Sequence, residues 1–370
     1  MRCLPVMFLM LLVSFACAAQ TLYVAPGGRD TWSGTRPAPN AAKTDGPLAS
    51  LVGARDAVRA LRARRGLRGP VHVRIAPGTY PMTGPVVFGP QDTGFQDAPI
   101  VYEAAAARKP VFSGGRTISG FHKRPDGLWE TTVADVAAGR WWFEQLWVGG
   151  VRAQRARLPK RFYFFMQAKV PYGIDPVTGK EAQLGGRAFQ ARPEDVKAVA
   201  ALPPDELKAT TFVVYHSWEV SEHHPAEVDA TTGRVVFYGP GAPWAFLEWA
   251  PNQRFHIENV PTAVTEPGEW ALRPDGTLLY KPRPGEDPSK TRVTAPVAQS
   301  FVEVRGTASE PVRFLTFRGL AFENGQYVTP LEGHGDGQAE VSIGAAVTAD
   351  YARDVVVKDC RIRHIGTYGI

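Results

Sequence analysis

The pattern of apolar and polar positions predicts a chain built mainly from short β-strands. Short apolar runs, several alternating with polar residues, occur at 71–75, 86–88, 100–103 and 117–121. Turns rich in Gly and Pro, such as PGTY at 77–80, separate these runs. No helical pattern follows each strand, which argues against a doubly wound α/β fold. The pattern therefore predicts an all-β protein.

One helix is predicted near the N-terminus, between an N-cap at Ser50 and an end at Gly66. The apolar positions along one side of it are Leu51, Val52, Val58 and Leu61. Seven arginines lie between Arg55 and Arg74 against one acid, Asp56, and this excess equals the whole net charge of +6. Most of them fall in the last turns, where they complement the helix dipole. We therefore expect a solvated helix face and no nucleic-acid partner.

The amino-acid composition excludes two further classes of protein. The chain is 44% hydrophobic and 21% charged, which is too apolar for a disordered protein. Its 370 residues include 37 Gly and 32 Pro, which interrupt the chain too often for a helical bundle. Outside the first 19 residues the only cysteine is Cys360, so no internal disulfide is possible, and we expect a small buried side chain there.

Residues 1–19 resemble a secretory signal peptide. An apolar run of about ten residues from Val6 to Phe15 is too short to span a bilayer. Cys17 lies in a small-x-small cleavage site, and Ser14 stands where a lipoprotein signal has an aliphatic residue. We therefore expect a secreted or periplasmic protein without a lipid anchor. No later segment is apolar for 18 residues, so no membrane span is expected.

The sequence pattern in the middle of the chain differs from that of the flanking parts and predicts a compact antiparallel domain over 125–295. A strand at 143–148, a turn at Gly149 and Gly150, and a strand at 151–157 form a predicted hairpin. Six of the nine tryptophans fall between residues 122 and 245: Trp129, Trp141, Trp142, Trp147, Trp218 and Trp244. We expect most of them in the core, with two or three at most lining a cleft.

The last part of the chain contains a repeat. Residues 314–325 align with 355–366 at an offset of 41, and residues 346–347 align with 369–370 at an offset of 23. A period in the low twenties is typical of a solenoid rung, and the longer offset adds a loop from Gln326 to Ala339. Such rungs bury their inner faces only by stacking, so they predict one continuous core.

Several motifs resemble right-handed parallel β-helix proteins of the pectate-lyase-like class, and most closely glycoside hydrolase family 141. The N-terminal motifs are LYVAPGG at 22–28, LVGARDAVRAL at 51–61 and PGTY at 77–80. The central ones are LWVGGVRAQRARLP at 146–159, ENV at 258–260, PGEW at 267–270 and LLYKP at 278–282. The resemblance covers nearly the whole chain after the leader.

The resemblance implies a right-handed parallel β-helix with an N-terminal capping helix and an inserted antiparallel β domain. The expected boundaries are 20–124 for the cap and first rungs, 125–295 for the insertion and 296–370 for further rungs. The family's β-helix runs many rungs further, so we expect the chain to stop in mid-rung at Ile370. The resemblance places the family's catalytic acids on those later rungs, and none is carried over here.

The acidic and histidine residues around the long loop are the local candidates for substrate binding. These candidates are Glu323, His334, Asp336, Glu340 and His364. Hydrolysis of a glycosidic bond needs two carboxyl groups, which neighbouring rungs can present. A plainer interpretation also fits each of them, since loop residues are often only solvated and strand-end residues often cap turns or pack. Glu332, Asn324 and Tyr368 raise the same two alternatives.

We expect no metal and no cofactor. His223 and His224, with Glu222 and Glu227 nearby, point to opposite faces of a strand and cannot easily share an ion, so we expect a surface pair. His216 lies beside Ser217 without a nucleophile-elbow motif, so its role is interpreted as structural.

Three functions remain open. The first is glycoside hydrolysis of a plant-type polysaccharide or oligosaccharide by a monomeric, secreted protein. The second is glycan binding or a surface role without catalysis. The third is a polysaccharide lyase, which ranks last because such an enzyme often holds Ca²⁺ in clustered acids and no Asp-rich cluster occurs in this chain. One scaffold hosts all of these chemistries, so the fold does not decide among them.

Overall fold

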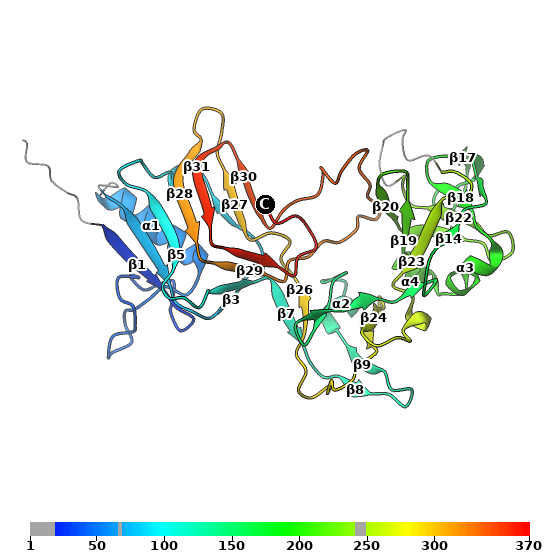
Figure 1. Ribbon diagram of the computed structural model, residues 1–370, viewed down its shortest axis with the longest axis horizontal. Coiled ribbons are helices and arrows are strands. Elements are labelled where there is room, and N and C mark those ends of the chain that lie inside the picture. The colour runs from blue at the N-terminus through cyan, green and yellow to red at the C-terminus, as the bar shows by residue number, and fades with distance from the viewer. Residues whose placement is uncertain (1–18, 66–68, 241–248) are drawn as a thin grey trace, which may run out of the picture.

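The computed structural model describes residues 19–65, 69–240 and 249–370 (Figure 1). Strands dominate these residues, which confirms the all-β prediction. Residues 1–18, where a signal peptide is expected, and Gly66 and Trp244 lie outside the described residues. The molecule is elongated, with a body of parallel strands at one end and a second body at the other (Figure 1). None of the described helices is long and apolar enough to cross a membrane.

Three parallel sheets form the first body, which we call the parallel body. The first sheet contains β1 (Gln20–Val24), β2 (Val71–Ile75), β5 (Ile100–Ala104), β28 (Val312–Arg318) and β31 (Ala352–Lys358). The second contains β3 (Thr79–Pro81), β6 (Val111–Ser113), β29 (Ala321–Glu323) and β32 (Arg361–Arg363). The third contains β4 (Val86–Phe88), β27 (Val302–Arg305) and β30 (Val347–Asp350). From β27 onward the chain visits the third, first and second sheets in turn, twice over.

Aromatic rings on neighbouring strands stack inside the parallel body. Phe88 packs edge-on against Tyr102 and Phe317, each at 5.2 Å between ring centroids. Phe112 stacks between Tyr80 and Phe322 at 5.1 and 5.7 Å. All six are buried, because parallel strands in register bring the same inward position of each strand together. Each ring pair adds about 1 kcal/mol beyond burial.

The register of the last strands corrects the sequence alignment by one residue. Leu315 pairs with Val355, so β28 and β31 are offset by 40 and not by 41. A shift of one residue turns every side chain to the other face of a strand. Phe314 and Asp354 occupy equivalent positions with positive φ angles of 50° and 55°, and they break the alternation on which the alignment relied. The offset of 23 is confirmed by the bridge between Ala345 and Tyr368.

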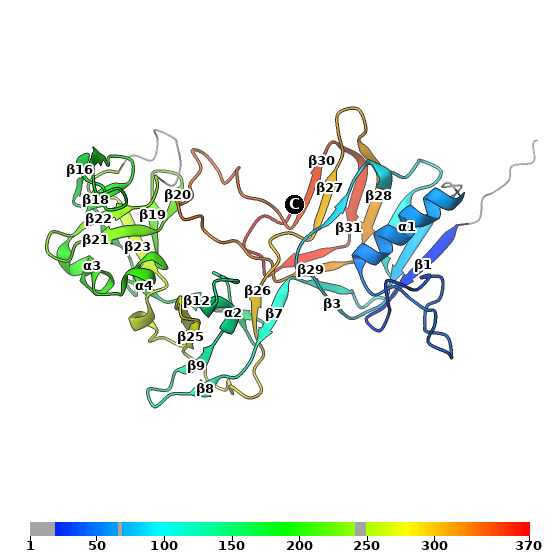
Figure 2. The same ribbon diagram turned by 180° about the vertical axis from the view of Figure 1, so that it is seen from behind.

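Helix α1 (Leu51–Arg65) lies across the N-terminal end of the parallel body, beside β1 (Figure 2). The predicted N-cap is confirmed, because the Ser50 hydroxyl accepts the Gly53 N–H at 2.9 Å. The expected solvated arginine face is wrong for Arg59, whose guanidinium donates to both oxygens of buried Asp92 at 2.8 and 2.7 Å. This fork ties α1 to the short helix η1 (Pro90–Asp92).

The strands from β7 to β26 form the second body, which we call the insertion. Its first sheet is β11 (Val151–Arg152), β10 (Trp147–Val148), β26 (Val293–Pro296) and β7 (Gly115–Ile118). Its second is β12 (Gln154–Arg155), β24 (Glu269–Leu272), β25 (Thr277–Tyr280), β9 (Trp129–Thr132) and β8 (His122–Lys123). Its third is β13 (Arg157–Leu158), β23 (Arg254–Glu258), β19 (Thr211–Tyr215) and β20 (Val220–His223), with β14 (Phe164–Phe165) beside β23.

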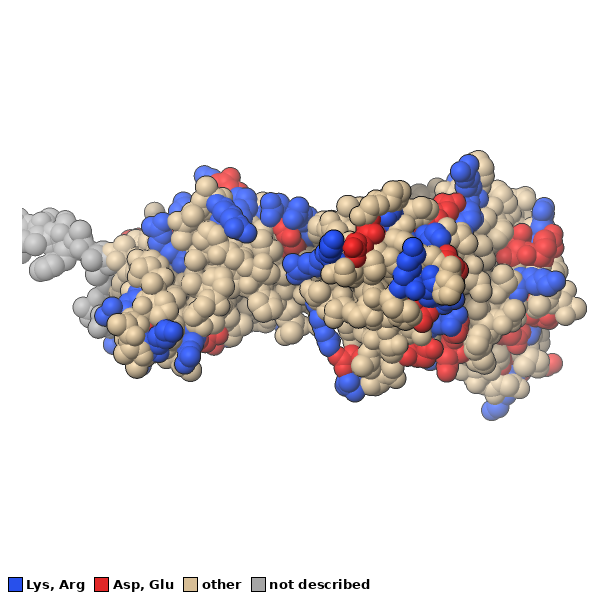
Figure 3. Space-filling view, turned by 90° about the horizontal axis from the view of Figure 1, so that it is seen from below, with Lys and Arg blue, Asp and Glu red and all other residues tan. Residues whose placement is uncertain are grey.

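The remaining strands of the insertion are β15 (Ala168–Lys169), β18 (Ala188–Gln190), β22 (Arg234–Phe237), β21 (Pro225–Val228), β16 (Tyr172–Ile174) and β17 (Glu181–Gln183). Its helices are α2 (Ala134–Ala137), α3 (Pro193–Ala200), α4 (Pro204–Lys208) and η2 (Pro261–Ala263). Strand pairing is antiparallel except between β12 and β24. The predicted hairpin at Gly149 and Gly150 is confirmed, with φ angles of 59° and 80°. Acidic and basic residues are interspersed over the insertion on the face that Figure 3 shows.

A long loop between β29 and β30 reaches from the parallel body to the insertion (Figure 1). There, His334 and Glu222 exchange two backbone hydrogen bonds of 2.8 Å, which adds a short bridge to the edge of β20. The Trp218 indole also donates to the Gly337 carbonyl at 3.0 Å. The loop is therefore docked on the insertion along this edge, and it carries three of the predicted site residues with it.

Candidate functional site

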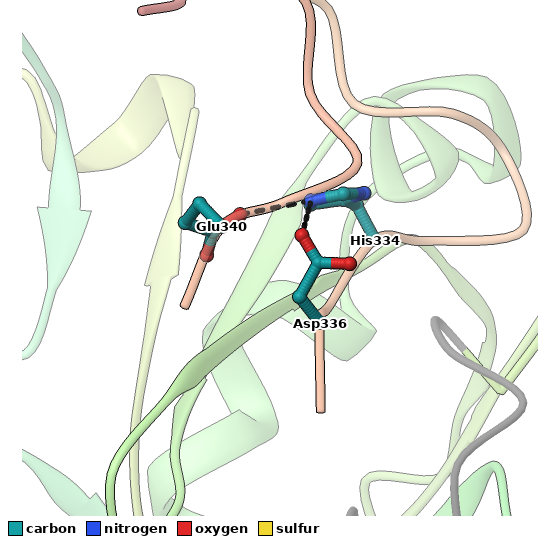
Figure 4. Close-up of side chains that lie close together, drawn as sticks. All are labelled: His334, Asp336 and Glu340. Carbon is teal, nitrogen blue, oxygen red and sulfur yellow. Dashed lines mark hydrogen bonds and ion pairs between the residues drawn. The ribbon is translucent and has the colours of Figure 1, made fainter. Parts of the chain in front are cut away.

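The long loop brings together three side chains that the sequence singled out (Figure 4). The His334 Nε2 lies 3.0 Å from a Glu340 oxygen and 3.8 Å from an Asp336 oxygen. Asp336 is almost fully buried, and burial opposes its ionisation. Hydrogen bonds from Ser342, one of them a backbone N–H at 3.0 Å, and the nearby imidazole outweigh that cost. They hold the pKa of Asp336 below its usual value.

A third acidic side chain interacts electrostatically with this cluster but comes from the insertion. Glu219 lies in the turn between β19 and β20. Burial, together with the charges of Glu340 and Asp336, raises the pKa of Glu219. One of its carboxylate oxygens is buried without a hydrogen-bond partner. The cluster therefore joins two segments more than a hundred residues apart.

Tyr327 stands beside this cluster on the same loop. Its ring lies edge-on to the His334 imidazole at 5.7 Å between centroids. Its hydroxyl is buried and has no hydrogen-bond partner among the residues that the structure describes. Burial, and the negative charges of Glu222 and Glu144, raise the pKa of Tyr327. The Tyr327 phenol therefore stays protonated, since it is surrounded by acidic side chains.

Two glutamates, Glu144 and Glu222, lie within hydrogen-bonding distance of the same hydroxyl group, that of Thr329. The Thr329 Oγ1 lies 3.1 Å from Glu144 and 2.5 Å from Glu222, and the Thr329 N–H donates to the same Glu144 oxygen at 3.1 Å. A hydroxyl carries one proton, so it can donate to only one of the two carboxyl groups. We assign the Thr329 proton to Glu144, whose carboxyl group also lies 3.8 Å from the Arg155 guanidinium. Burial raises the pKa of Glu222, so we assign the proton between Glu222 and Thr329 to Glu222, which then donates to the hydroxyl.

The electrostatic surroundings support this assignment. Burial and the negative charges of Glu144 and Glu258 raise the pKa of Glu222. Glu258 behaves in the opposite way, because a 3.0 Å bond to His256 and the charge of Arg155 outweigh its burial and lower its pKa. The pKa values of these neighbouring carboxyl groups are thus shifted in opposite directions, which is typical of functional sites.

Two cavities flank the loop, and Val328 lines both. The first, of about 400 Å³, lies between the loop and strands β27 and β30. Its polar and aromatic lining is Gln299, Ser300, Glu303, Gln326, Tyr327, His334, Ser342, Thr348 and Thr367. We call it the loop cavity. The second, of about 580 Å³, is lined by Trp141 and Trp142.

The structure gives the other two predicted site residues different partners. The Glu323 carboxylate is buried and accepts bonds from Arg361 and Arg363, each at 2.9 Å. It therefore ties β29 to β32, where the next strand pairs in parallel. His364 stacks on Trp147 at 5.5 Å between ring centroids, in a left-handed backbone conformation. Both arrangements are those of residues that hold strands together.

The prediction of a surface pair at His223 and His224 is wrong, because both side chains are buried. His223 bonds to the Ser221 hydroxyl at 2.7 Å, and His224 bonds to the Thr210 carbonyl at 2.9 Å. Burial lowers the pKa of His223 to about 3, which keeps the imidazole neutral. The two rings have separate partners, as residues on opposite faces of a strand should.

Sequence reasoning missed the residues that complete the site from elsewhere. Glu219, Glu144, Tyr327 and Thr329 were not singled out, and Glu222 was noted only as a neighbour of a histidine. No local pattern marks them, because they meet only when the loop docks on β20. The one signal available was the placement of Glu219 and Glu222 around an expected strand end.

No protein-family model matches the chain, and no curated protein matches it. A solved structure described as "Glycoside hydrolase" is similar, with a TM-score of 0.75 at 24% identity. The match covers 94% of this chain and 62% of that one, so the present chain spans less than two thirds of that protein's length. At this identity the likeness shows a glycoside hydrolase-like fold.

A second solved structure, "The complex structure of XylC with xylose", matches with a TM-score of 0.40 at 12% identity. It covers 93% of this chain and 40% of that one. This likeness is too weak to carry an argument.

Proposed function

We propose that this chain is part of a secreted or periplasmic carbohydrate-active protein that hydrolyses glycosidic bonds in a plant-type polysaccharide. We further propose that the three parallel sheets are the faces of a right-handed parallel β-helix like that of glycoside hydrolase family 141. The fold shared with a glycoside hydrolase over 94% of the chain supports this proposal. Fold likeness alone does not define a reaction, so the proposal depends on the site.

The loop cavity is the observation that carries the proposal. Its lining supplies hydroxyls, amides, a carboxyl group, an imidazole and a phenol ring. A sugar presents hydroxyl groups that need donors and acceptors and a C–H face that packs on an aromatic ring. Nine polar or aromatic side chains around about 400 Å³ suit one sugar residue better than an apolar ligand. We assign this cavity to holding the saccharide.

We place the carboxyl pair that cleaves the bond on rungs after Ile370, as the family resemblance implies. Glu144 and Glu222 do not fit that role here, because the Thr329 hydroxyl already lies between them. They are assigned to holding the loop that forms one wall of the cavity.

The test compares this chain with a chain extended by any coding sequence that continues its reading frame after Ile370. Both are assayed for binding by affinity electrophoresis and for release of reducing sugar from plant polysaccharides. We expect binding in both and hydrolysis in the longer chain. Binding without hydrolysis at full length would support a glycan-binding protein instead, and an unsaturated product absorbing in the ultraviolet would indicate a lyase.

Two isosteric variants link the result to the cavity. Thr348→Val removes a hydroxyl from the cavity lining, and we expect about tenfold weaker saccharide binding, the effect of one lost hydrogen bond. Thr316→Val is the matched control, because Thr316 lies on β28 and lines neither cavity beside the loop. Equal binding by both variants would show that the sugar lies elsewhere.

A further inference from the structure

The larger of the two cavities that flank the long loop has the lining of a second binding site. It encloses about 580 Å³ and is lined by the loop, by α2 and by α4. We call it the tryptophan cavity, because Trp141 and Trp142 belong to its lining. Val328 lines this cavity and the loop cavity, so the loop forms a wall that the two share.

Trp142 offers this cavity an aromatic surface that no other ring uses. Trp141 is already covered, since the Arg116 guanidinium lies 4.6 Å and the Phe143 ring 4.8 Å from its centroid. Trp142 is half-buried, and among the described residues neither an aromatic ring nor a cation stacks on its indole. A 3.4 Å bond between its Nε1 and Glu144 fixes the orientation of the ring. A flat apolar ring held in this way suits the C–H face of a sugar.

Two charged side chains of α4, Asp205 and Lys208, line the same cavity. Both are exposed, and neither forms an ion pair with a described residue. The Lys208 ammonium lies over the Tyr238 ring, 5.3 Å from its centroid, and this contact orients it. Arg140 also lines the cavity, but it is already paired with Asp135. One charge of each sign therefore remains for a ligand.

This pair of charges suits the hydroxyl groups of a neutral sugar. The ammonium of Lys208 can donate to a hydroxyl oxygen, and the carboxylate of Asp205 can accept from a hydroxyl. An acidic sugar would gain from the lysine but would be repelled by the aspartate. The balance of charge therefore favours a neutral sugar over an acidic one.

The buried polar residues of the lining, His224 and Thr329, are engaged by the protein itself. The His224 Nδ1 lies 2.9 Å from the Thr210 carbonyl, and its Nε2 lies 3.3 Å from the Thr329 carbonyl. The Thr329 hydroxyl lies between the two glutamates that hold the loop. These residues fix the wall of the cavity, which leaves the ligand to the tryptophan and the two side chains of α4.

We propose that the tryptophan cavity is a second saccharide site, where Trp142, Asp205 and Lys208 bind a neutral sugar unit of the chain that also occupies the loop cavity. This inference rests on the proposed function, because it takes the ligand of the loop cavity to be a saccharide. The shared wall at Val328 places the two sites on either side of one loop segment. A saccharide that crosses this segment gains affinity from both sites, since the second contact is made within one complex.

The test uses the full chain in calorimetric titrations. The neutral probes are xylohexaose, cellohexaose and mannohexaose, and the acidic probe is hexagalacturonate. We expect one equivalent of a neutral hexasaccharide to bind, more tightly than hexagalacturonate does. Trp142→Ala and Lys208→Met should each weaken this binding by about tenfold, the effect of one lost stacking contact or one lost bond to a charged group. Trp142→Phe keeps an aromatic ring and should retain most of the affinity.

The matched control is Lys197→Met, which removes an exposed lysine on α3 that lines neither cavity and should leave binding unchanged. If Thr348→Val weakened binding while Trp142→Ala and Lys208→Met did not, the second site would be overturned and the proposed function would stand. If no probe bound, or if all three variants bound as tightly as the unaltered chain, both would fall. Tighter binding of hexagalacturonate than of every neutral probe would overturn the assignment to a neutral sugar.

Discussion

Glu144 and Glu222 are joined through a single hydroxyl, that of Thr329. The oxygen lies 3.1 Å from the first carboxyl group and 2.5 Å from the second. Glu144 comes from the segment before β10, Glu222 from β20 and Thr329 from the long loop. Two consecutive hydrogen bonds through the Thr329 hydroxyl therefore hold three parts of the molecule together. Their strength depends on Glu222 remaining protonated, which leads to a prediction about pH.

Stability should fall as pH rises through the pKa of Glu222. Burial raises that pKa above the ordinary 4.5 of the unfolded chain, so between these values the folded protein binds more protons than the unfolded one. The stabilisation is complete below about pH 4.5 and is lost as the carboxyl group ionises in the folded state. Glu222→Gln keeps a donor to Thr329 and cannot ionise. It should be more stable than the unaltered protein at pH 8 by on the order of 1 kcal/mol.

Urea unfolding at several pH values checks this prediction. Glu144→Gln is the matched control, because it removes the charged acceptor and leaves the titrating group in place. It should lower stability and keep a weaker pH dependence, because burial still raises the pKa of Glu222 after the charge of Glu144 is removed. If the unfolding free energies of the unaltered protein and Glu222→Gln ran parallel from pH 4 to pH 8, the shared-proton assignment would be wrong.

Removing the bridging hydroxyl should cost more than removing an outlying one. Thr329→Val preserves shape but leaves the buried Glu144 and the half-buried Glu222 without their common partner. We expect a loss of about 1–3 kcal/mol, the usual penalty for unsatisfied buried groups. Thr316→Val, on partly exposed β28 surface, should change the unfolding free energy by less than about 0.5 kcal/mol. Equal losses in the two variants would contradict the bridging role.

Two buried histidines should destabilise the protein in acid. Burial lowers the pKa of His216 to about 4, and that of His223 to about 3, so the folded state keeps both neutral. The unfolded chain takes up protons below about pH 6.5, so stability is lost as pH falls through that value. At pH 5 each histidine should cost about 2 kcal/mol. This slope is opposite in sign to that of Glu222.

His216→Gln tests the acid effect without removing the bonding partner of Ser221. A Gln side chain can still bond to the Ser221 hydroxyl, which lies 2.7 Å from the imidazole, but it does not titrate. Between pH 7 and pH 5, this variant should lose about half as much stability as the unaltered protein loses. The control His122→Gln changes a side chain that is 64% exposed and should leave the pH profile unchanged. An unchanged profile in His216→Gln would rule out this cause of acid sensitivity.

The sequence predicted features that depend on neighbouring residues. The Ser50 cap, the hairpin at Gly149 and Gly150 and the grouping of the loop acids all follow from local spacing. The repeat was found but misread by one residue. The left-handed residues Phe314 and Asp354 break strict alternation, and a pattern of period two does not reveal such a break.

What the sequence could not give is the set of partners that docking brings together. Thr329 and Glu144 are 185 residues apart, and Thr329 and Glu222 are 107 apart. The sequence pattern around Glu222 is that of an ordinary exposed strand residue, because it gives no sign that the loop covers this side chain. The same limit explains why His223 was expected at the surface, since the β sheet that buries it is assembled from distant strands. Pairing across such distances depends on packing and leaves no local signature.

A variant of Glu323 can show whether this residue has a structural role or a substrate-binding role. Its side chain is 9% exposed and accepts bonds from Arg361 and Arg363 on the neighbouring strand. Glu323→Gln should lower the unfolding free energy by about 1–3 kcal/mol, because charge-assisted bonds to a buried carboxylate are lost. Saccharide binding at the loop cavity should not change. Glu310→Gln, an exposed acid before β28, serves as the control for loss of a negative charge. Weaker binding by Glu323→Gln at unchanged stability would return this residue to the list of substrate contacts, since a residue that only pairs strands acts through stability.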